Sequence, residues 1–108
     1  MSSATAVTAS SFESEVARSP IPVLIDFWAE WCAPCRSVIA PAIDELAKTY
    51  AGRIKMVSID ADAENGLADR FGVVSVPTLV VMNKGSEYSK KAGAVPKHEI
   101  ERLFRDLL

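Results

Sequence analysis

The stretch VLIDFWAEWCAPC, residues 23–35, decides the fold of this 108-residue chain. Its first part, Val23 to Trp28, is a continuous apolar run rich in branched and aromatic residues, with the carboxylate of Asp26 in its middle. That composition is typical of a strand buried on both faces of a sheet. A long amphipathic segment begins at Cys32, so we expect a buried strand to lead directly into a helix.

The helix that begins at Cys32 is predicted to run to Tyr50, because apolar residues recur there at spacings of three and four. Pro41 interrupts it. Upstream, Ser10 followed by Glu13 is a capping-box pattern for a helix ending near Arg18.

The remaining segments alternate between strand and helix patterns. Strands are predicted over residues 4–8, 54–60, 79–82 and 88–92, with a hairpin turn at 83–85 before the last of them. Further helices are predicted over residues 64–71 and from Pro96 onward, where Ile100, Leu103, Phe104, Leu107 and Leu108 form one apolar stripe. Alternating strands and helices closed by a hairpin and a helix indicate the α/β class with a mixed central sheet.

Length and charge restrict the possible functions. A chain of 108 residues with 12 Lys+Arg, 14 Asp+Glu and a net charge of −2 is expected to form a single domain over residues 1–108, with residues 1–3 disordered. The sequence has no run of Lys and Arg residues, so we do not expect it to bind nucleic acid or an anionic membrane. Neither a spanning segment nor an intact export signal is recognisable, so we expect a cytoplasmic protein, or the mature form of an imported one.

The two cysteines, Cys32 and Cys35, are the only ones in the chain. A disulfide closing so short a loop is a weak structural staple. A zinc site needs about four ligands, and the only other soft candidate is the distant His98. The pair therefore indicates redox chemistry.

Thiol exchange requires a stabilised thiolate close to a second thiol. Cys32 follows a buried strand and opens a helix, so free backbone N–H groups and the helix dipole favour its thiolate, and we expect it to be exposed. Cys35 lies one turn further along and is expected to be less exposed and to attack the sulfur of Cys32 once that sulfur is bonded to a substrate. Pro34 between them restricts the geometry of the pair.

The string FWAEWCAPC at residues 27–35, together with Asp26, the Val-Pro-Thr at 76–78, Gly85 and the Gly-Ala at 93–94, closely resembles the thioredoxin family. The resemblance covers essentially the whole chain. It implies the thioredoxin fold, a mixed five-stranded sheet flanked by four helices. It also implies a monomeric protein-disulfide reductase, without bound cofactor or metal, that acts on disulfide-containing targets and is recharged by an NADPH-flavin or ferredoxin-linked thioredoxin reductase.

The resemblance also implies roles for individual residues. Pro77 matches the proline that is cis in this fold and faces the cysteine pair. The apolar groove for a substrate strand would be lined by Trp31, Ala33, Pro34, Val76, Gly93 and Ala94.

Asp26 matches the family's buried acid, the proton acceptor for the deeper thiol. The residues themselves point the same way, because a carboxylate inside an apolar strand is desolvated and its pKa should rise. The alternative is a carboxylate at a strand end that is hydrogen-bonded to nearby backbone.

Three positions depart from the family pattern. Ala33 stands where most members have Gly, and we expect a modestly shifted redox balance. Ser58 stands where the family often has a Lys, and Lys55 cannot replace it because odd separation in a strand places it on the opposite face. Cys35 and Pro41 are separated by six positions instead of five. We predict a π-type bulge or kink between Arg36 and Pro41 that absorbs the extra residue.

Two other functions fit a Cys-x-x-C chain. An oxidase or isomerase usually carries a His between its cysteines and a secretory signal, and this chain has neither. A non-catalytic binding module would present the apolar groove to a single partner and would function without its cysteines.

Overall fold

The computed structural model describes residues 4–108, so the prediction made for residues 1–3 lies outside the described residues. Within that range five strands form one mixed sheet in the order β1-β3-β2-β4-β5. The strands are β1 (Thr5–Ala6), β2 (Val23–Trp28), β3 (Lys55–Asp60), β4 (Thr78–Asn83) and β5 (Ser86–Ala92). Strands β1, β3 and β2 are mutually parallel, whereas β4 and β5 are antiparallel to their neighbours.

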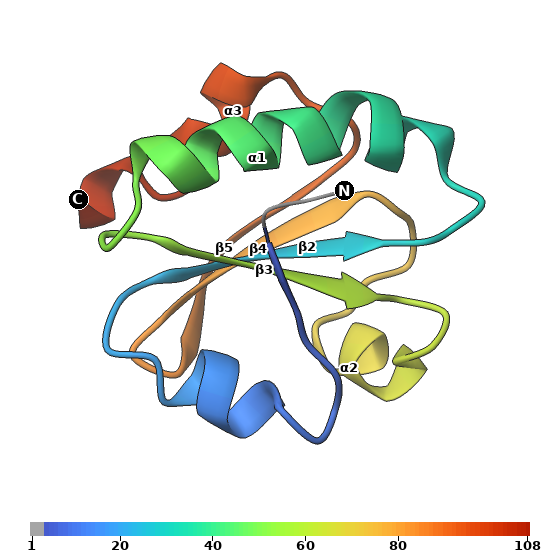
Figure 1. Ribbon diagram of the computed structural model, residues 1–108. Coiled ribbons are helices and arrows are strands. Elements are labelled where there is room, and N and C mark those ends of the chain that lie inside the picture. The colour runs from blue at the N-terminus through green and yellow to red at the C-terminus, as the bar shows by residue number, and fades with distance from the viewer. Residues whose placement is uncertain (1–3) are drawn as a thin grey trace.

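The helical segments lie on both faces of this sheet (Figure 1). They are η1 (Glu13–Ala17), η2 (Cys35–Ile39), α1 (Ala40–Thr49), α2 (Asn65–Arg70), α3 (Lys97–Arg102) and η3 (Arg105–Leu107). Figure 1 shows α1 and α3 covering one face, while η1, in blue, and α2 cover the other. Since η2 continues into α1 and η3 follows α3, residues 4–108 confirm the predicted α/β fold with four flanking helical regions.

The central strand β2 has the predicted bounds, and both of its faces are covered. Leu24 packs with Ile43, Leu46 and the other residues of the core beneath α1 and α3. Ile25 and Phe27 belong to the second core, on the side of η1 and α2. Asp26 comes two residues after Leu24 in the strand, so its side chain points to the same face of the sheet, the face that α1 covers.

The active-site helix contains the predicted irregularity. Residues Cys35–Ile39 form a π-helix, in which the N–H of Ala40 donates to the carbonyl oxygen of Cys35, five residues earlier. One residue is therefore accommodated in a single wide turn instead of rotating everything after it by about 100°. Downstream, α1 keeps Ile43 and Leu46 buried, so the prediction of a local π-type bulge is confirmed.

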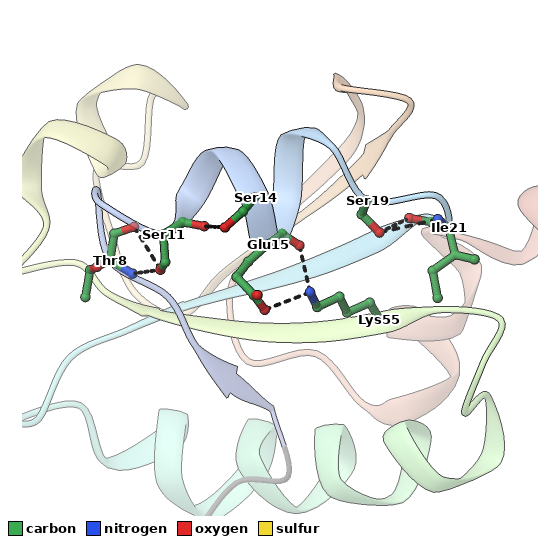
Figure 2. Close-up of polar contacts among 7 residues, drawn as sticks. All are labelled: Thr8, Ser11, Ser14, Glu15, Ser19, Ile21 and Lys55. Atoms are coloured by element: carbon green, nitrogen blue, oxygen red, sulfur yellow. Dashed lines mark hydrogen bonds and ion pairs between the residues drawn. The ribbon is translucent and has the colours of Figure 1, made fainter.

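The predicted capping box at Ser10 and Glu13 is wrong. Within residues 4–108 no side chain caps η1. Ser11 closes the loop before η1 instead, because its Oγ accepts a hydrogen bond of 3.0 Å from the N–H of Thr8, three residues earlier in the chain (Figure 2).

Lys55 lies on the face opposite Asp26, as predicted. Its Nζ donates to Oε1 of Glu15 over 2.8 Å and to the Glu15 carbonyl oxygen over 2.9 Å (Figure 2). Ser58 is instead the residue of β3 in register with Asp26.

The C-terminal apolar stripe is shorter than predicted. Ile100 and Phe104 are fully buried, but Leu108 is 46% exposed. Helix α3 ends at Arg102, and the separate short helix η3 covers Arg105–Leu107. Because this break changes the helical phase, the last leucine does not continue the stripe.

Candidate active site

Cys32 and Cys35 form a disulfide at the carboxyl end of β2, with their Cα atoms 5.3 Å apart. Residues after β2 turn sharply, since the N–H of Cys32 donates to the carbonyl oxygen of Ala29 over 3.0 Å. Helical backbone begins at Ala33. Cys32 thus occupies the position just before the helix, as expected.

The two sulfurs are not equivalent. The backbone N–H of Cys35 donates to Sγ of Cys32 over 3.2 Å. This is the bond that an N-cap side chain accepts from the third residue of a helix. A negative charge on Cys32 would be stabilised by the same donor and by the helix dipole.

Cys32 is less exposed than predicted. Both cysteines have the same relative exposure of 3%, so the expectation of an exposed Cys32 above a more buried Cys35 is wrong for the disulfide form. Ala29, Trp28 and Val76 pack around the pair, and the bond between the sulfurs covers part of each. Access is provided by the rim, where Ala33 and Pro34 are exposed and Trp31 is 70% exposed.

The loop before β4 lies against the disulfide. The peptide bond between Val76 and Pro77 is cis, as predicted, and Val76 packs on the cysteine cluster. The N–H of Gly93 donates to the carbonyl oxygen of Pro77 over 2.9 Å, which brings Gly93 and the exposed Ala94 to this loop. The residues predicted to line the groove therefore come from three separate segments, residues 31–34, 76 and 93–94.

Asp62 joins the site without having been predicted. Its Oδ2 accepts a hydrogen bond of 2.8 Å from Nε1 of Trp31. A hollow of about 210 Å³ extends from Trp31 and Asp62 to Val76. Asp62 follows the carboxyl end of β3, beside that of β2, and this placement next to a parallel neighbour is the signal that could have indicated it.

Asp26 is the buried acid of the site. It is 3% exposed, and its Oδ1 has no hydrogen-bond partner among the described residues, so the alternative of a carboxylate tied to backbone does not hold for that oxygen. Burial raises the pKa of Asp26 to about 7, as predicted in direction. The carboxyl group lines a cavity of about 500 Å³ that Cys35 also lines, and Cys32 is not among the lining residues.

Comparison with known proteins agrees with this geometry. The family model for thioredoxin matches residues 3–106. The chain belongs to the thioredoxin family. Thioredoxin 1 of Nostoc sp. is 46% identical over 104 residues, which are 96% of each chain. The thioredoxin of Haemophilus influenzae is 42% identical over the same shares. The chloroplastic thioredoxin M4 of Arabidopsis thaliana is 39% identical over 92% of this chain and 51% of its own.

Thioredoxin-family membership and the Cys32–Cys35 disulfide together give the reaction class: the protein is a dithiol:disulfide oxidoreductase. Among residues 4–108, no helix is both long and apolar enough to cross a membrane.

Proposed function

We propose that the chain works in the reducing direction, as a general reductase of protein disulfides, with Cys32 as the nucleophile. The observation that carries the assignment of Cys32 as the nucleophile is the hydrogen bond from the Cys35 N–H to Sγ of Cys32. This bond stabilises a negative charge on the sulfur of Cys32, and among residues 4–108 no equivalent hydrogen bond reaches the sulfur of Cys35. The reducing direction is supported by membership of the thioredoxin family.

The reaction proceeds in two exchanges. The thiolate of Cys32 attacks one sulfur of a target disulfide, forms a mixed disulfide and releases the other target sulfur as a thiolate. The thiolate of Cys35 then attacks Sγ of Cys32 and expels the remaining target thiolate. The target gains two electrons and the Cys32–Cys35 pair loses two.

Asp26 supports the second exchange. Cys35 must lose its proton before it attacks, and Asp26 shares a cavity with it. A carboxyl group with a pKa of about 7 is half ionised near neutral pH, so it can accept that proton and return it. The shared cavity is the proposed path for the proton between the two groups.

Target proteins would bind along the rim of the disulfide. Trp31, Ala33, Pro34, Val76, Gly93 and Ala94 form the proposed apolar groove, in which the peptide group of Val76 would pair with an extended target segment. Pro34 and Pro77 shape this groove around the sulfurs. Main-chain pairing and apolar contacts depend little on the target's sequence, so this mode of binding favours many targets over one.

The remaining parts of the proposal follow from the chemistry of the pair. The two sulfurs carry the electrons, so no resident cofactor or metal takes part. A thioredoxin reductase, either NADPH-flavin or ferredoxin-linked, would restore the dithiol. We propose a monomer that acts in electron transport and in redox homeostasis of the cytoplasm or of an organelle.

The reduction potential of the Cys32–Cys35 couple tests the direction of the reaction. A value near about −270 mV is expected for a reductase, whereas a value near about −120 mV would show an oxidant. The double variant Cys32→Ser, Cys35→Ser separates catalysis from scaffolding. A reductase loses its activity on disulfide substrates in this variant, and a binding module would keep its function.

A further inference from the structure

The cavity beside Asp26 is larger than a proton path requires. It measures about 500 Å³, which falls within the range of about 300 to 1,000 Å³ that is typical of small-molecule sites. A single water needs only about 30 Å³. The volume therefore leaves room for an organic molecule.

Small side chains on neighbouring strands create this space. Ala6 is in register with Ser58, and Ser58 is in register with Asp26, so β1, β3 and β2 present these three residues in one row. Trp28 lies two residues after Asp26 on the same face of β2, and Ala4 lies two residues before Ala6, just ahead of β1. All five residues line the cavity.

On the side opposite the sheet, the cavity is bounded by the irregular first turns of the active-site helix. Cys35 and Arg36 of η2 and Ala40, the first residue of α1, line it. The methyl group of Ala40 reaches less far toward the sheet than a larger apolar side chain would.

One polar atom in this cavity is without a partner. Asp26 is 3% exposed, and its Oδ1 accepts no hydrogen bond from the described residues. A buried acceptor without a donor costs about 1 to 3 kcal/mol, and more when it is charged. A ligand that brings a donor to this oxygen would recover that free energy.

The charged residues around the cavity determine which kind of hydrogen-bond donor a ligand should bring to Asp26. Asp26 and Arg36 are the only charged residues among the described ones that line it. The guanidinium of Arg36 donates from Nη1 to the carbonyl oxygen of Glu30, which holds that charge on the loop before the helix. The other residues close to the carboxylate carry no charge. They are Ser58 of β3, Ala6 of β1, Ala4 just before β1, Ala40 of α1 and Leu79, the β4 residue in register with Asp26.

We propose that this cavity binds a primary alkylammonium ion with a compact apolar body. The ammonium group donates to Oδ1 of Asp26 and balances its charge, and the apolar body packs on the alanines and on Trp28. A neutral alcohol of the same shape supplies a donor but leaves the carboxylate charge unbalanced. The consequence for the reaction rests on the proposed function, because the ligand would occupy the oxygen that accepts the proton of Cys35.

The test uses 2-phenylethylamine and its neutral counterpart 2-phenylethanol on the oxidised protein. In that form the cysteines do not titrate, so the carboxyl carbon of Asp26, followed by NMR against pH, reports on the cavity alone. We expect the amine to lower the Asp26 titration midpoint by about 1 pH unit or more, as a nearby opposite charge does. The alcohol should not lower it.

Two variants of neighbouring residues on β1 test whether the amine binds inside the cavity. Ala6→Leu fills the cavity and should abolish the effect of the amine, whereas Thr5→Leu, the neighbouring residue of β1 with the opposite side-chain direction, should retain it. Ala40→Leu fills the cavity from the helix side and provides an independent plug.

Three results would overturn the proposal: no shift with the amine, equal shifts with amine and alcohol, or an undiminished shift in both plugged variants. None of them depends on turnover. Disulfide reductase activity measured without amine tests the proposed function separately.

Discussion

Asp26 on β2 stands in register with Ser58 on β3, and the pair contains no positive charge. The carboxyl group is buried, and desolvation is the cause of its raised pKa of about 7. Because burial makes ionisation of Asp26 unfavourable, its pKa lies near neutral pH, where the carboxyl group can both accept and release a proton. The cost of ionisation also has consequences for stability.

Replacing Asp26 by Ala should stabilise the protein at high pH. The pKa of Asp26 is about 7 in the fold against a model value of 3.8, so between these values the folded state binds a proton that the unfolded state has released. Stability therefore falls as pH rises from about 4 to about 7 and then levels off. A difference of about 3 in pKa corresponds to at most about 4 kcal/mol. Denaturant unfolding from pH 4 to 9 measures it.

Asp60 provides the control for this experiment, because it lies on the neighbouring strand but keeps its contacts with the backbone N–H groups of Asp62 and Ala63. Asp60→Ala should not gain stability at high pH. An Asp26→Ala protein with the same pH profile as the wild type would contradict the account of Asp26.

A lysine at position 58 should lower the pKa of Asp26. Ser58→Lys places an ammonium group beside the carboxylate in the α1-side cavity, and the opposite charge favours the ionised form. NMR titration of the Asp26 carboxyl group measures the change. Ser58→Met, of similar length and without charge, is the matched control, and a Ser58→Lys protein without a downward shift would refute the role assigned to the missing charge.

Deleting Val38 should leave the fold intact. The π-helix at Cys35–Ile39 contains the extra residue, and Val38 is 40% exposed. Its removal converts the wide turn to a regular one and leaves Ile43 and Leu46 facing the core, so a change in the free energy of unfolding within about 1 kcal/mol is expected.

Deletion of Ala42 gives the contrast. No wide turn follows it, so Ile43 and Leu46 would rotate by about 100° away from the core, at a cost of about 3 kcal/mol or more. Thermal or denaturant unfolding of the two deletions compares them directly. Equal destabilisation would show that the π-helix does not absorb the added residue.

The sequence predicted those elements whose patterns are local. β2 has the expected bounds because branched and aromatic residues predominate from Val23 to Trp28, which is typical of a buried strand. The wide turn before Pro41 follows from one surplus residue in an otherwise matching helix. The cis bond before Pro77 was predicted from family resemblance alone, since an isolated X-Pro pair is cis in only about 5% of cases.

Features that depend on tertiary packing were missed or misjudged. The exposure of Cys32 was overestimated because Val76 and Trp28, distant from each other in sequence, both pack around it. The cavity was not predicted, since it needs Ala6, Ala40 and Ser58 to meet from three separate segments. The capping box predicted at Ser10 and Glu13 does not form, because the backbone geometry before η1, which the two residue types do not reveal, decides whether their side chains reach the backbone N–H groups.

Trapping the mixed disulfide is the most direct test of Cys32 as the nucleophile and Cys35 as the resolving residue. Reduced Cys35→Ser protein should form a covalent complex with a disulfide-containing target, stable on a non-reducing gel and released by dithiothreitol. Reduced Cys32→Ser protein should form little or none. The opposite pattern, with the complex held by Cys35, would contradict the account.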